Sequence, residues 1–240
     1  MSLQFEYYKN AILPRRRCCG PEYNDNEYYL KSARAEADRL VSIGLTADTA
    51  VLDIGCGQGR LAIGLLVSGR EIRYYRGLDV QMHSIEWCQK FIANSHPEFQ
   101  FIHIDVMNAR YNRKGQPIDK NFRFPFDSEE FDIVYLFSVF THMIKEDVKI
   151  YLREIKRLLS PSGKVFLSAF IKSNAPNMTI NPEGYQKKLG LKRWSGKLQC
   201  VLYDRGFFES MLTEYGFKID RTEKINEWGQ EGIYISGRSS

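Results

Sequence analysis

The sequence predicts an α/β fold in which helices cover a doubly wound, mostly parallel sheet. Short apolar runs with strand character alternate with longer runs of helical periodicity along most of the chain. In addition, the apolar run 50–54 leads into a turn with glycine at positions 55, 57 and 59, and a helical run follows directly. Strand, glycine turn and helix in this order form a ligand-binding corner of open α/β sheets.

Each expected element has a local signal. The first helix, about 25–43, has apolar residues at helical spacing, Asn24 or Asp25 as its N-cap and Gly44 at its end. A helix over about 145–159 is stopped by the turn residues 160–163. The remaining helices are expected at about 59–68, 83–94 and 204–216, and the strands at about 50–54, 72–79, 99–104, 131–137, 164–170, 217–225 and 231–237.

The 240 residues predict a single domain with four parts. An N-terminal lid and helix occupy 1–44, the core of the alternating pattern 45–170, an insertion 171–203, and the last helix with a hairpin 204–240. A strand-like run, 198–203, ends the insertion. Residues 107–130 contain Gly115, Pro117 and Pro125 and are expected to be an irregular, functional or mobile loop.

Composition indicates a globular protein, with 43% hydrophobic and 26% charged residues. No apolar stretch is long enough to span a bilayer, so no membrane is expected. The five cysteines are odd in number and irregularly spaced, which argues against a disulfide scaffold and favours a reducing cytoplasm. The pair Cys18–Cys19 suggests either a metal or redox site or, as we prefer, two thiols of the lid; no metal is predicted.

The net charge is +5, and two basic clusters stand out at Arg15–Arg17 and Lys187–Lys197. Either cluster could attract a phosphate or carboxylate of a substrate. The alternative, which we favour, is that both are solvated surface.

The residues in and around the glycine turn distinguish between the classes of protein that contain such a turn. The dinucleotide fingerprint requires a third glycine three residues after Gly57, where this chain has Arg60. A P-loop requires Gly-Lys-Ser or Gly-Lys-Thr, which is absent. Asp53, two residues before Gly55, suits a cationic amino group better than a pyrophosphate. The helix start behind the turn offers backbone N–H groups to a ligand.

Residues 51–60, Val-Leu-Asp-Ile-Gly-Cys-Gly-Gln-Gly-Arg, resemble motif I of the class I S-adenosylmethionine-dependent methyltransferases. Segments 75–79, 101–106, 131–138 and 158–165 resemble later segments of that family in the same order. The resemblance implies a Rossmann-like, seven-stranded sheet of order 3-2-1-4-5-7-6. It also implies S-adenosyl-L-methionine as cofactor and S-adenosyl-L-homocysteine as product.

The resemblance also implies roles for individual residues. Asp79 is expected to accept the ribose hydroxyls, although it could instead cap the next helix, for which Ser84 is the other candidate cap. Arg60 is expected to bind either the methionine carboxylate or a carboxylate of a helix. The further expected cofactor contacts are Asp53, Gly55, Cys56 and Gly57 near the methionine part, Val80, Met82, Asp105 and Val106 near adenine, and Phe137 and Ser138 near the sulfonium. The alternative for Val80 and Met82 is core packing, and the alternative for Asp105 is an Asx-turn in the loop.

His142, just past the fourth strand, is the candidate general base, since an imidazole accepts a proton near neutral pH. The alternative is a structural histidine bonded to loop backbone. Aromatic residues of the N-terminus and the insertion could roof the site as a lid or simply pack on its flanks: Phe5, Tyr7, Tyr8, Tyr23, Tyr28, Tyr29, Tyr185, Trp194 and Tyr203.

These inferences predict an enzyme that transfers a methyl group to an oxygen or nitrogen of a small molecule. The alternatives are an RNA methyltransferase, including a cap-guanine type, a protein methyltransferase, and a cofactor-binding protein without catalysis. Nucleic acid is less favoured because no basic–aromatic binding pattern occurs. The sequence does not indicate an oligomeric state.

Overall fold

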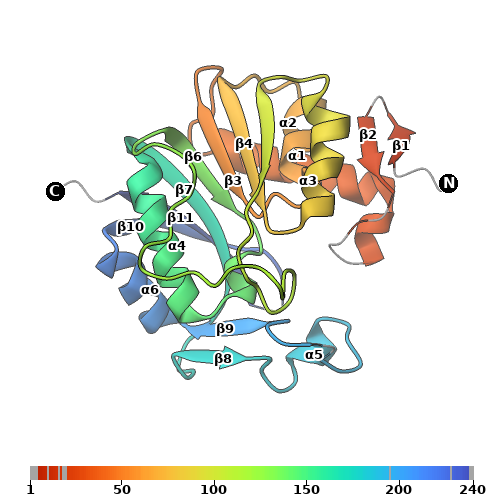
Figure 1. Cartoon of the computed structure of the whole chain (residues 1–240). Helices are drawn as coiled ribbons and strands as arrows, with labels where there is room; N and C mark the ends of the chain where they lie inside the picture. The colour runs from red at the N-terminus through yellow and green to blue at the C-terminus, as the bar shows by residue number, and fades with distance from the viewer. Residues whose placement is uncertain are drawn as a thin grey trace. The chain divides into compact units, whose positions relative to one another are not determined.

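The computed structural model describes residues 5–9, 11–15, 17, 21–194, 196–227 and 229–237. Backbone contacts divide the chain into two compact units, Met1–Ile104 and Asp105–Ser240. Each unit has its own part of the sheet and its own helices, which can be followed in Figure 1.

The first unit begins with a small antiparallel hairpin that the sequence did not predict. Strand β1 (Phe5–Tyr8) pairs with β2 (Ala11–Pro14), and a 3-10 turn, η1 (Pro21–Asn24), leads into helix α1 (Asn26–Val41). The Asp25 carboxylate caps this helix by accepting a hydrogen bond from the Tyr28 N–H at 2.7 Å. Of the two expected caps, the structure therefore selects Asp25.

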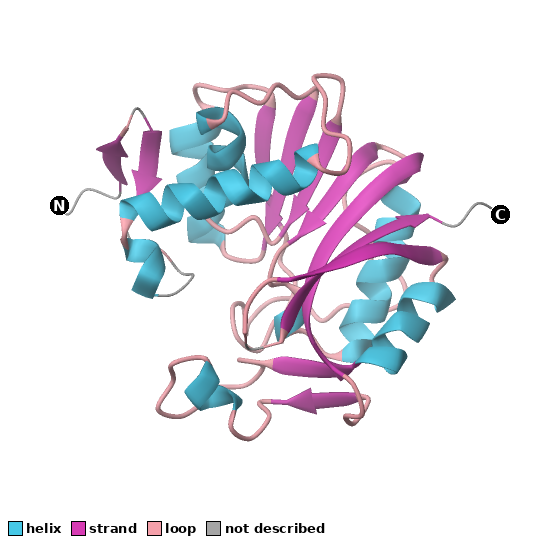
Figure 2. Ribbon diagram, turned by 180° about the vertical axis from the view of Figure 1, so that it is seen from behind, coloured by secondary structure: helices cyan, strands magenta, loops and turns pink. Residues whose placement is uncertain are grey.

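Three parallel strands form the sheet of the first unit: β3 (Ala50–Ile54), β4 (Tyr74–Asp79) and β5 (Phe99–His103). Their order β5-β4-β3 confirms the predicted 3-2-1 half of the sheet. Helix α2 (Arg60–Val67) joins the first two strands. Helix α3 (Met82–Cys88), continued by a π-helical turn, η2 (Gln89–Ala93), joins the second pair. In Figures 1 and 2 the helices of this unit lie on one side of its strands.

Helices α1 and α2 touch through their backbones. A Cβ atom at Gly64 of α2 would lie 2.0 Å from the Ala33 carbonyl oxygen of α1, so only glycine permits this approach. The start of α3 differs from the sequence prediction. Ser84 lies inside that helix and is buried, while the N-cap position is Gln81, which forms no side-chain cap. The expected capping role of Ser84 is therefore wrong.

The sheet of the second unit contains β6 (Phe131–Leu136), β7 (Leu159–Lys172), β10 (Phe217–Lys224) and β11 (Gln230–Gly237). Strand β6 is parallel to β7, whereas β11 is antiparallel to both β7 and β10. The order β6-β7-β11-β10 confirms the predicted 4-5-7-6 half. A 3-10 turn, η3 (Phe140–His142), precedes helix α4 (Lys145–Leu158), which lies on the same side of this sheet as α6 (Arg205–Glu214), as Figures 1 and 2 show.

Strand β7 begins earlier than expected. Helix α4 ends at Leu158, as the turn residues predicted, but Leu159 already pairs with Phe131 of β6. The register then shifts, and Ile133 pairs with Lys164. The predicted turn at 160–163 is thus absorbed as a bulge within the strand, because Pro161 cannot donate to a ladder hydrogen bond.

The insertion folds as an extension of β7. Its strand β9 (Val201–Asp204) pairs in parallel with the end of β7 and antiparallel with β8 (Met178–Ile180). A short helix, α5 (Tyr185–Lys188), lies between β8 and β9 in the sequence. Its small core contains Phe170, Tyr185, Cys200 and Leu202, with Leu189 and Trp194 packed against it. The insertion is therefore anchored by an apolar cluster that it shares with Phe170 of β7.

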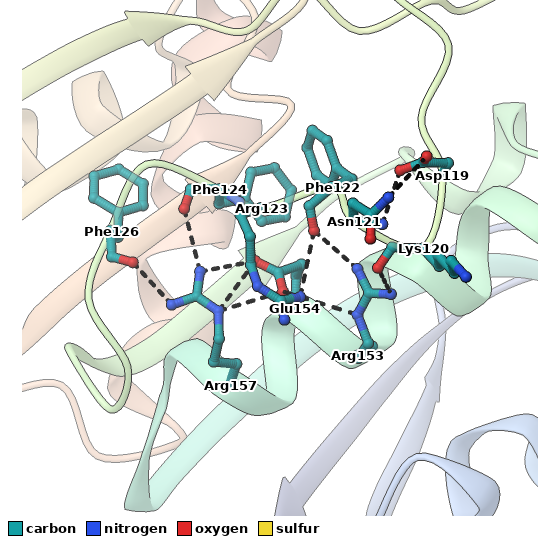
Figure 3. A network of polar contacts seen from close by, with 10 residues as sticks. All are labelled: Asp119, Lys120, Asn121, Phe122, Arg123, Phe124, Phe126, Arg153, Glu154 and Arg157. Carbon is teal, nitrogen blue, oxygen red and sulfur yellow. Dashed lines mark hydrogen bonds and ion pairs between the residues drawn. The ribbon is translucent and has the colours of Figure 1, made fainter.

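Loop 107–130 contains no helix or strand, as predicted, yet one end of it is firmly held (Figure 3). Arg153 of α4 donates to the carbonyls of Lys120 and Phe122, and Arg157 donates to those of Phe124 and Phe126. The fully buried Glu154 carboxylate accepts from the Phe124 N–H at 3.0 Å. Helix α4 thereby provides partners for the backbone groups of an irregular segment.

Candidate functional site

The glycine turn is closed by its own hydrogen bonds. The N–H groups of Gly55 and Cys56 donate to the Leu78 carbonyl at 2.7 and 2.9 Å, and the Gly57 N–H donates to Asp79 Oδ2 at 2.8 Å. The N–H groups at 55–57 therefore stabilise the turn itself, whereas the expected donors to a ligand belong to the start of α2 behind it. A phosphate would find the N–H groups at 55–57 already occupied, which separates this turn from nucleotide phosphate loops.

Asp79 ends β4 and links the turn to the next helix. Its two carboxylate oxygens accept the N–H groups of Gly57 and Gln81, each at 2.8 Å. Burial raises the pKa of Asp79, and these two hydrogen bonds oppose that rise. Each carboxylate oxygen has a second lone pair, so the group can still accept hydroxyl donors.

The surface above the turn is open. Gly57 has a φ of +53°, and a Cβ atom added there would meet no atom within 4 Å. Nearby in sequence, Met82 at the start of α3 is 49% exposed, and Val80 is partly buried with its carbonyl 3.2 Å from His103 Nε2. An open glycine and an exposed apolar side chain suit a ligand with a flat, partly apolar group.

Asp53 lies beneath the turn rather than on its surface. It is buried, the Tyr75 hydroxyl donates to it, and burial raises its pKa to about 8. The Tyr75 hydrogen bond opposes this shift, whereas the nearby negative charge of Glu36 adds to it. At neutral pH this acid therefore retains a proton until a cation comes near it.

Arg60 begins α2 and is paired within the first unit. Its guanidinium donates to the buried Glu36 carboxylate of α1, with Nε 2.9 Å from Oε1, and lies 4.7 Å from the Tyr23 ring centre. The carboxylate of a helix is thus one partner of Arg60. The Cys56 side chain is also buried, and burial raises the pKa of its thiol well above the ordinary value.

In the second unit, Ser138 follows β6 with a φ of +59°, a conformation that non-glycine residues rarely adopt. Its N–H donates to Ser168 Oγ at 2.8 Å, and the Gln230 carboxamide donates to both Ser138 Oγ at 2.8 Å and Ser168 Oγ at 3.1 Å. Its neighbour Phe137 is stacked with Tyr135. Gln230 thus supports Ser138 from a strand 92 residues later in the chain.

The backbone N–H of Gln230 determines which end of the Gln230 carboxamide faces the two serines. The Gln230 N–H donates to Asn226 Oδ1 at 3.1 Å, so the Asn226 amide nitrogen faces Gln230 Oε1 at 3.0 Å. The Gln230 amide nitrogen must then face the two serines. Because Ser138 Oγ accepts from Gln230, its own proton is available for another acceptor. Sequence reasoning missed Gln230, whose only signal is a polar residue leading into the apolar strand β11.

His142 ends η3, and its Nδ1 lies 3.0 Å from the Leu198 carbonyl oxygen of the insertion. A carbonyl only accepts, so Nδ1 carries the proton and Nε2 keeps its lone pair in the neutral ring. Burial lowers the pKa of His142 to about 4, and the positive charge of Arg110 contributes. The imidazole is therefore neutral at physiological pH.

Asp105 and Val106 begin the second unit. Asp105 Oδ1 accepts from the Asn112 amide at 3.0 Å, while its backbone carbonyl accepts from the Gln116 N–H at 2.8 Å. Asp105 is exposed and Val106 is buried. The Asp105 side chain is thus available to solvent, while the backbone around it is fixed.

The aromatic residues and basic clusters singled out in the sequence differ in their burial and pairing. Tyr185 and Tyr203 are buried in the second unit, as flank packing requires, whereas Tyr7 is 73% exposed in the first. Arg17 is paired with Glu6 and covers the Tyr29 ring, so it is no free surface cation, while Cys18, Cys19 and Arg16 lie outside the described residues. The basic side chains of the insertion are exposed: Lys187, Lys188, Lys192, Arg193 and Lys197.

The described residues contain no group of three or more His, Cys, Asp or Glu side chains that could hold a metal ion. Within the same part of the chain, no helix has the length and apolar character needed to cross a bilayer.

Comparison with known proteins agrees with this geometry. Residues 52–167 match the family described as methyltransferase domain. The uncharacterized methyltransferase Rv0089 of Mycobacterium tuberculosis is 26% identical over 155 residues, which are 65% of this chain and 64% of that protein. The chain thus spans somewhat less than two thirds of the length of this relative.

Solved structures show the same fold. The PH0226 protein of Pyrococcus horikoshii superposes with a TM-score of 0.61 at 18% identity, covering 92% of this chain and 97% of its own. The 1,6-didemethyltoxoflavin N1-methyltransferase of Burkholderia thailandensis, solved with its substrate and S-adenosylhomocysteine, superposes with a TM-score of 0.56 at 14% identity. That match covers 89% of this chain and 80% of its own. Residues 52–167 are thus similar to a methyltransferase domain, and the doubly wound fold is shared with a methyltransferase solved with S-adenosylhomocysteine.

Proposed function

We propose that this chain transfers the methyl group of S-adenosyl-L-methionine to an oxygen or nitrogen atom of a small molecule. One observation carries the proposal: a glycine turn that is hydrogen-bonded to Asp79 and open above Gly57. The Burkholderia methyltransferase of the same fold has a small molecule bound, which supports the acceptor class.

The residues present fit the cofactor's chemistry. Asp79 would accept the ribose hydroxyls with its remaining lone pairs, and the exposed Met82 with Val80 would cover the adenine. Asp53 would receive the amino group, whose positive charge would release the proton that burial holds there. The other proposed contacts are Gly55, Cys56, Gly57 and Arg60 in the first unit and Asp105, Val106, Phe137 and Ser138 in the second.

The sulfonium of the cofactor supplies an activated methyl group, so the protein needs chiefly to align the acceptor and exclude water. We propose that His142 accepts the acceptor's proton at Nε2. Its Nδ1–H is held by the Leu198 carbonyl, which fixes the ring orientation that this role requires. The low pKa makes His142 a weak base but keeps it in the proton-accepting form. The fixed hydroxyl of Ser138 would donate a hydrogen bond to a polar group of the acceptor.

The three free, buried thiols of Cys56, Cys88 and Cys200 support the proposal of a reducing, cytoplasmic compartment. An RNA acceptor is the second candidate, favoured by the five exposed cations of the insertion.

Transfer of a labelled methyl group tests the proposal. Purified protein is incubated with methyl-labelled S-adenosylmethionine and a lysate separated into small-molecule, RNA and protein fractions. Label in the small-molecule fraction is the expected result. Label in RNA, with binding that weakens steeply as salt increases, would establish the second candidate instead. Titration of S-adenosylhomocysteine without any transfer to the three fractions would indicate binding without catalysis.

His142→Gln tests the base. We expect slower turnover with unchanged affinity for S-adenosylhomocysteine. Equal turnover of the two proteins across the pH range would remove His142 from the reaction.

A further inference from the structure

A tight turn in loop 107–130 is fixed to the backbone of His142. The N–H groups of Asn108 and Asn112 each donate to the other's carbonyl, at 2.9 and 3.0 Å. The Asn108 side chain accepts the N–H groups of Arg110 and Tyr111 and donates to the His142 carbonyl at 3.1 Å. The amide oxygen therefore closes the turn with both of its lone pairs, and the amide nitrogen fixes the turn against η3.

This anchoring brings a cation, an aromatic ring and the imidazole together. The Tyr111 ring meets the His142 ring edge to face, with centres 5.4 Å apart, and the Arg110 guanidinium lies 5.1 Å from the Tyr111 ring centre. The arrangement depends on the backbone hydrogen bonds between Asn108 and Asn112 and on the fully bonded Asn108 side chain, so it is built into the fold.

Arg110 differs from the paired arginines of the molecule. Its Nε is buried and has no hydrogen-bond partner. Among the described residues, its guanidinium forms neither a hydrogen bond nor an ion pair with any side chain or carbonyl. By contrast, Arg17 and Arg157 each donate to several acceptors. A partly buried guanidinium without an anion is costly, and its planar donor fork matches a carboxylate or a phosphate.

The surroundings of Arg110 are also positive. Arg113 and Lys114 follow on the same turn, and the Arg113 guanidinium comes within 3.5 Å of the position that a Cβ atom of Gly196 would occupy. The basic cluster Lys187–Lys197 of the insertion therefore meets this turn. These cations would attract an anion by long-range steering, while Arg110 offers the one partly buried, unsatisfied donor among them.

We propose that Arg110 binds an oxyanion, a carboxylate or a phosphate, of the methyl acceptor beside His142. The assignment of the ligand as the acceptor rests on the proposed function, whereas the anion site itself stands on Arg110 alone. An anion paired with Arg110 would cancel the positive charge that faces His142. The imidazole would then bind a proton more readily, so the bound acceptor would improve its own base.

The test uses the imidazole as a reporter, because the chain has only four histidines and their labelled resonances can be separated. The full-length protein, with labelled histidine, is titrated with sodium phosphate and, separately, with sodium acetate at constant ionic strength adjusted with sodium chloride. We expect a saturable shift of the His142 resonances with one or both anions. A response to phosphate alone indicates a phosphorylated acceptor, and a response to acetate alone indicates a carboxylate.

Two substitutions of the same turn make the comparison specific. Arg110→Gln should weaken the anion affinity about tenfold or more, which is typical of losing charge-assisted hydrogen bonds. Lys114→Gln removes the same charge from an exposed position and should leave the affinity nearly unchanged. If Arg110→Gln fails to fold, Arg110→Lys should retain weaker but measurable binding. Equal losses for Arg110→Gln and Lys114→Gln, or no saturable shift in the wild type, would overturn the site.

Calorimetry with S-adenosylhomocysteine on the same samples separates this proposal from the proposed function. Cofactor binding without any anion effect overturns the Arg110 site alone. Anion binding without cofactor binding leaves the site in place and overturns methyl transfer.

Discussion

Asp79 combines two tasks in one side chain, since it holds the glycine turn and is proposed to bind the ribose. Asp79→Ala removes every charge-assisted hydrogen bond of that carboxylate. We expect the affinity for S-adenosylhomocysteine to fall by about 1.5–3 kcal/mol, measured by isothermal titration calorimetry. Asp48→Ala, which removes an exposed acid of the same unit, is the matched control. Equal affinities of the Asp79 variant and the control would remove Asp79 from the site.

The buried acid Asp53 predicts a proton released on binding. Its pKa of about 8 exceeds the ordinary value of 3.8, so the folded protein holds a proton that the unfolded chain has lost between these values. This proton stabilises the fold fully below pH 3.8, and the contribution disappears as the pH rises through 8. An ammonium group next to Asp53 lowers this pKa and displaces the proton at pH 7.

Calorimetry of S-adenosylhomocysteine at pH 7, in two buffers of different ionisation enthalpy, counts the released protons. We expect up to about one proton for the wild type. The Asp53→Asn variant should release fewer protons, and the difference from the wild type should equal the number that Asp53 releases, because the amide does not titrate. Identical counts for the two proteins would show that the amino group binds elsewhere.

At the scale of elements, α4 holds the irregular segment 119–126 through two arginines and one buried carboxylate. The Glu154 side chain is fully buried and accepts from Arg123, Arg157 and the Phe124 N–H. Burial alone would raise the pKa of Glu154, but these donors bring it below its ordinary value. The group therefore remains ionised at neutral pH and provides the centre of the network in Figure 3.

Glu154→Gln replaces one acceptor oxygen by a donor that faces an arginine. We expect a loss of about 3 kcal/mol in the free energy of unfolding, measured with urea, and faster hydrogen exchange of the amides in 119–126. Glu146→Gln on the same helix changes an exposed acid and should alter neither quantity by more than about 0.5 kcal/mol. Unchanged exchange in the Glu154 variant would show that the segment is held by the arginines alone.

The sequence predicted features whose cause is local. The spacing of glycines and the acid at the end of β4 are fixed by the backbone of a strand–turn–helix corner, so Gly57 and Asp79 could be found from a few neighbouring residues. The partner of Ser138 could not, because Gln230 is distant in sequence and its strand has no polar motif. The turn that carries Arg110 was also missed as a unit, since loop 107–130 has no periodicity and its conformation depends on the Asn108 side chain. The β1–β2 hairpin lies in a segment whose aromatic content suggested a lid instead.

For the whole molecule, binding of the cofactor and stability of the fold are linked. A ligand that binds only the folded state stabilises it by about 2.7 kcal/mol at a concentration of 100 times its Kd. The size of this effect therefore reports binding without any knowledge of the acceptor. Two glycines of the first unit make the measurement specific. Gly57 and Gly69 have φ values of +53° and +60°, and a Cβ atom at either would meet nothing within 4 Å.

Alanine at either position should lower the free energy of unfolding by a similar amount, about 1 kcal/mol, because both residues keep a left-handed backbone conformation. Only at Gly57 would the new methyl group enter the space proposed for the cofactor. Thermal unfolding should therefore show that S-adenosylhomocysteine stabilises Gly69→Ala as much as the wild type, whereas Gly57→Ala loses most of the stabilisation. Equal stabilisation of the two variants would place the cofactor away from the turn, and the roles proposed for Asp53 and Asp79 would fall with it.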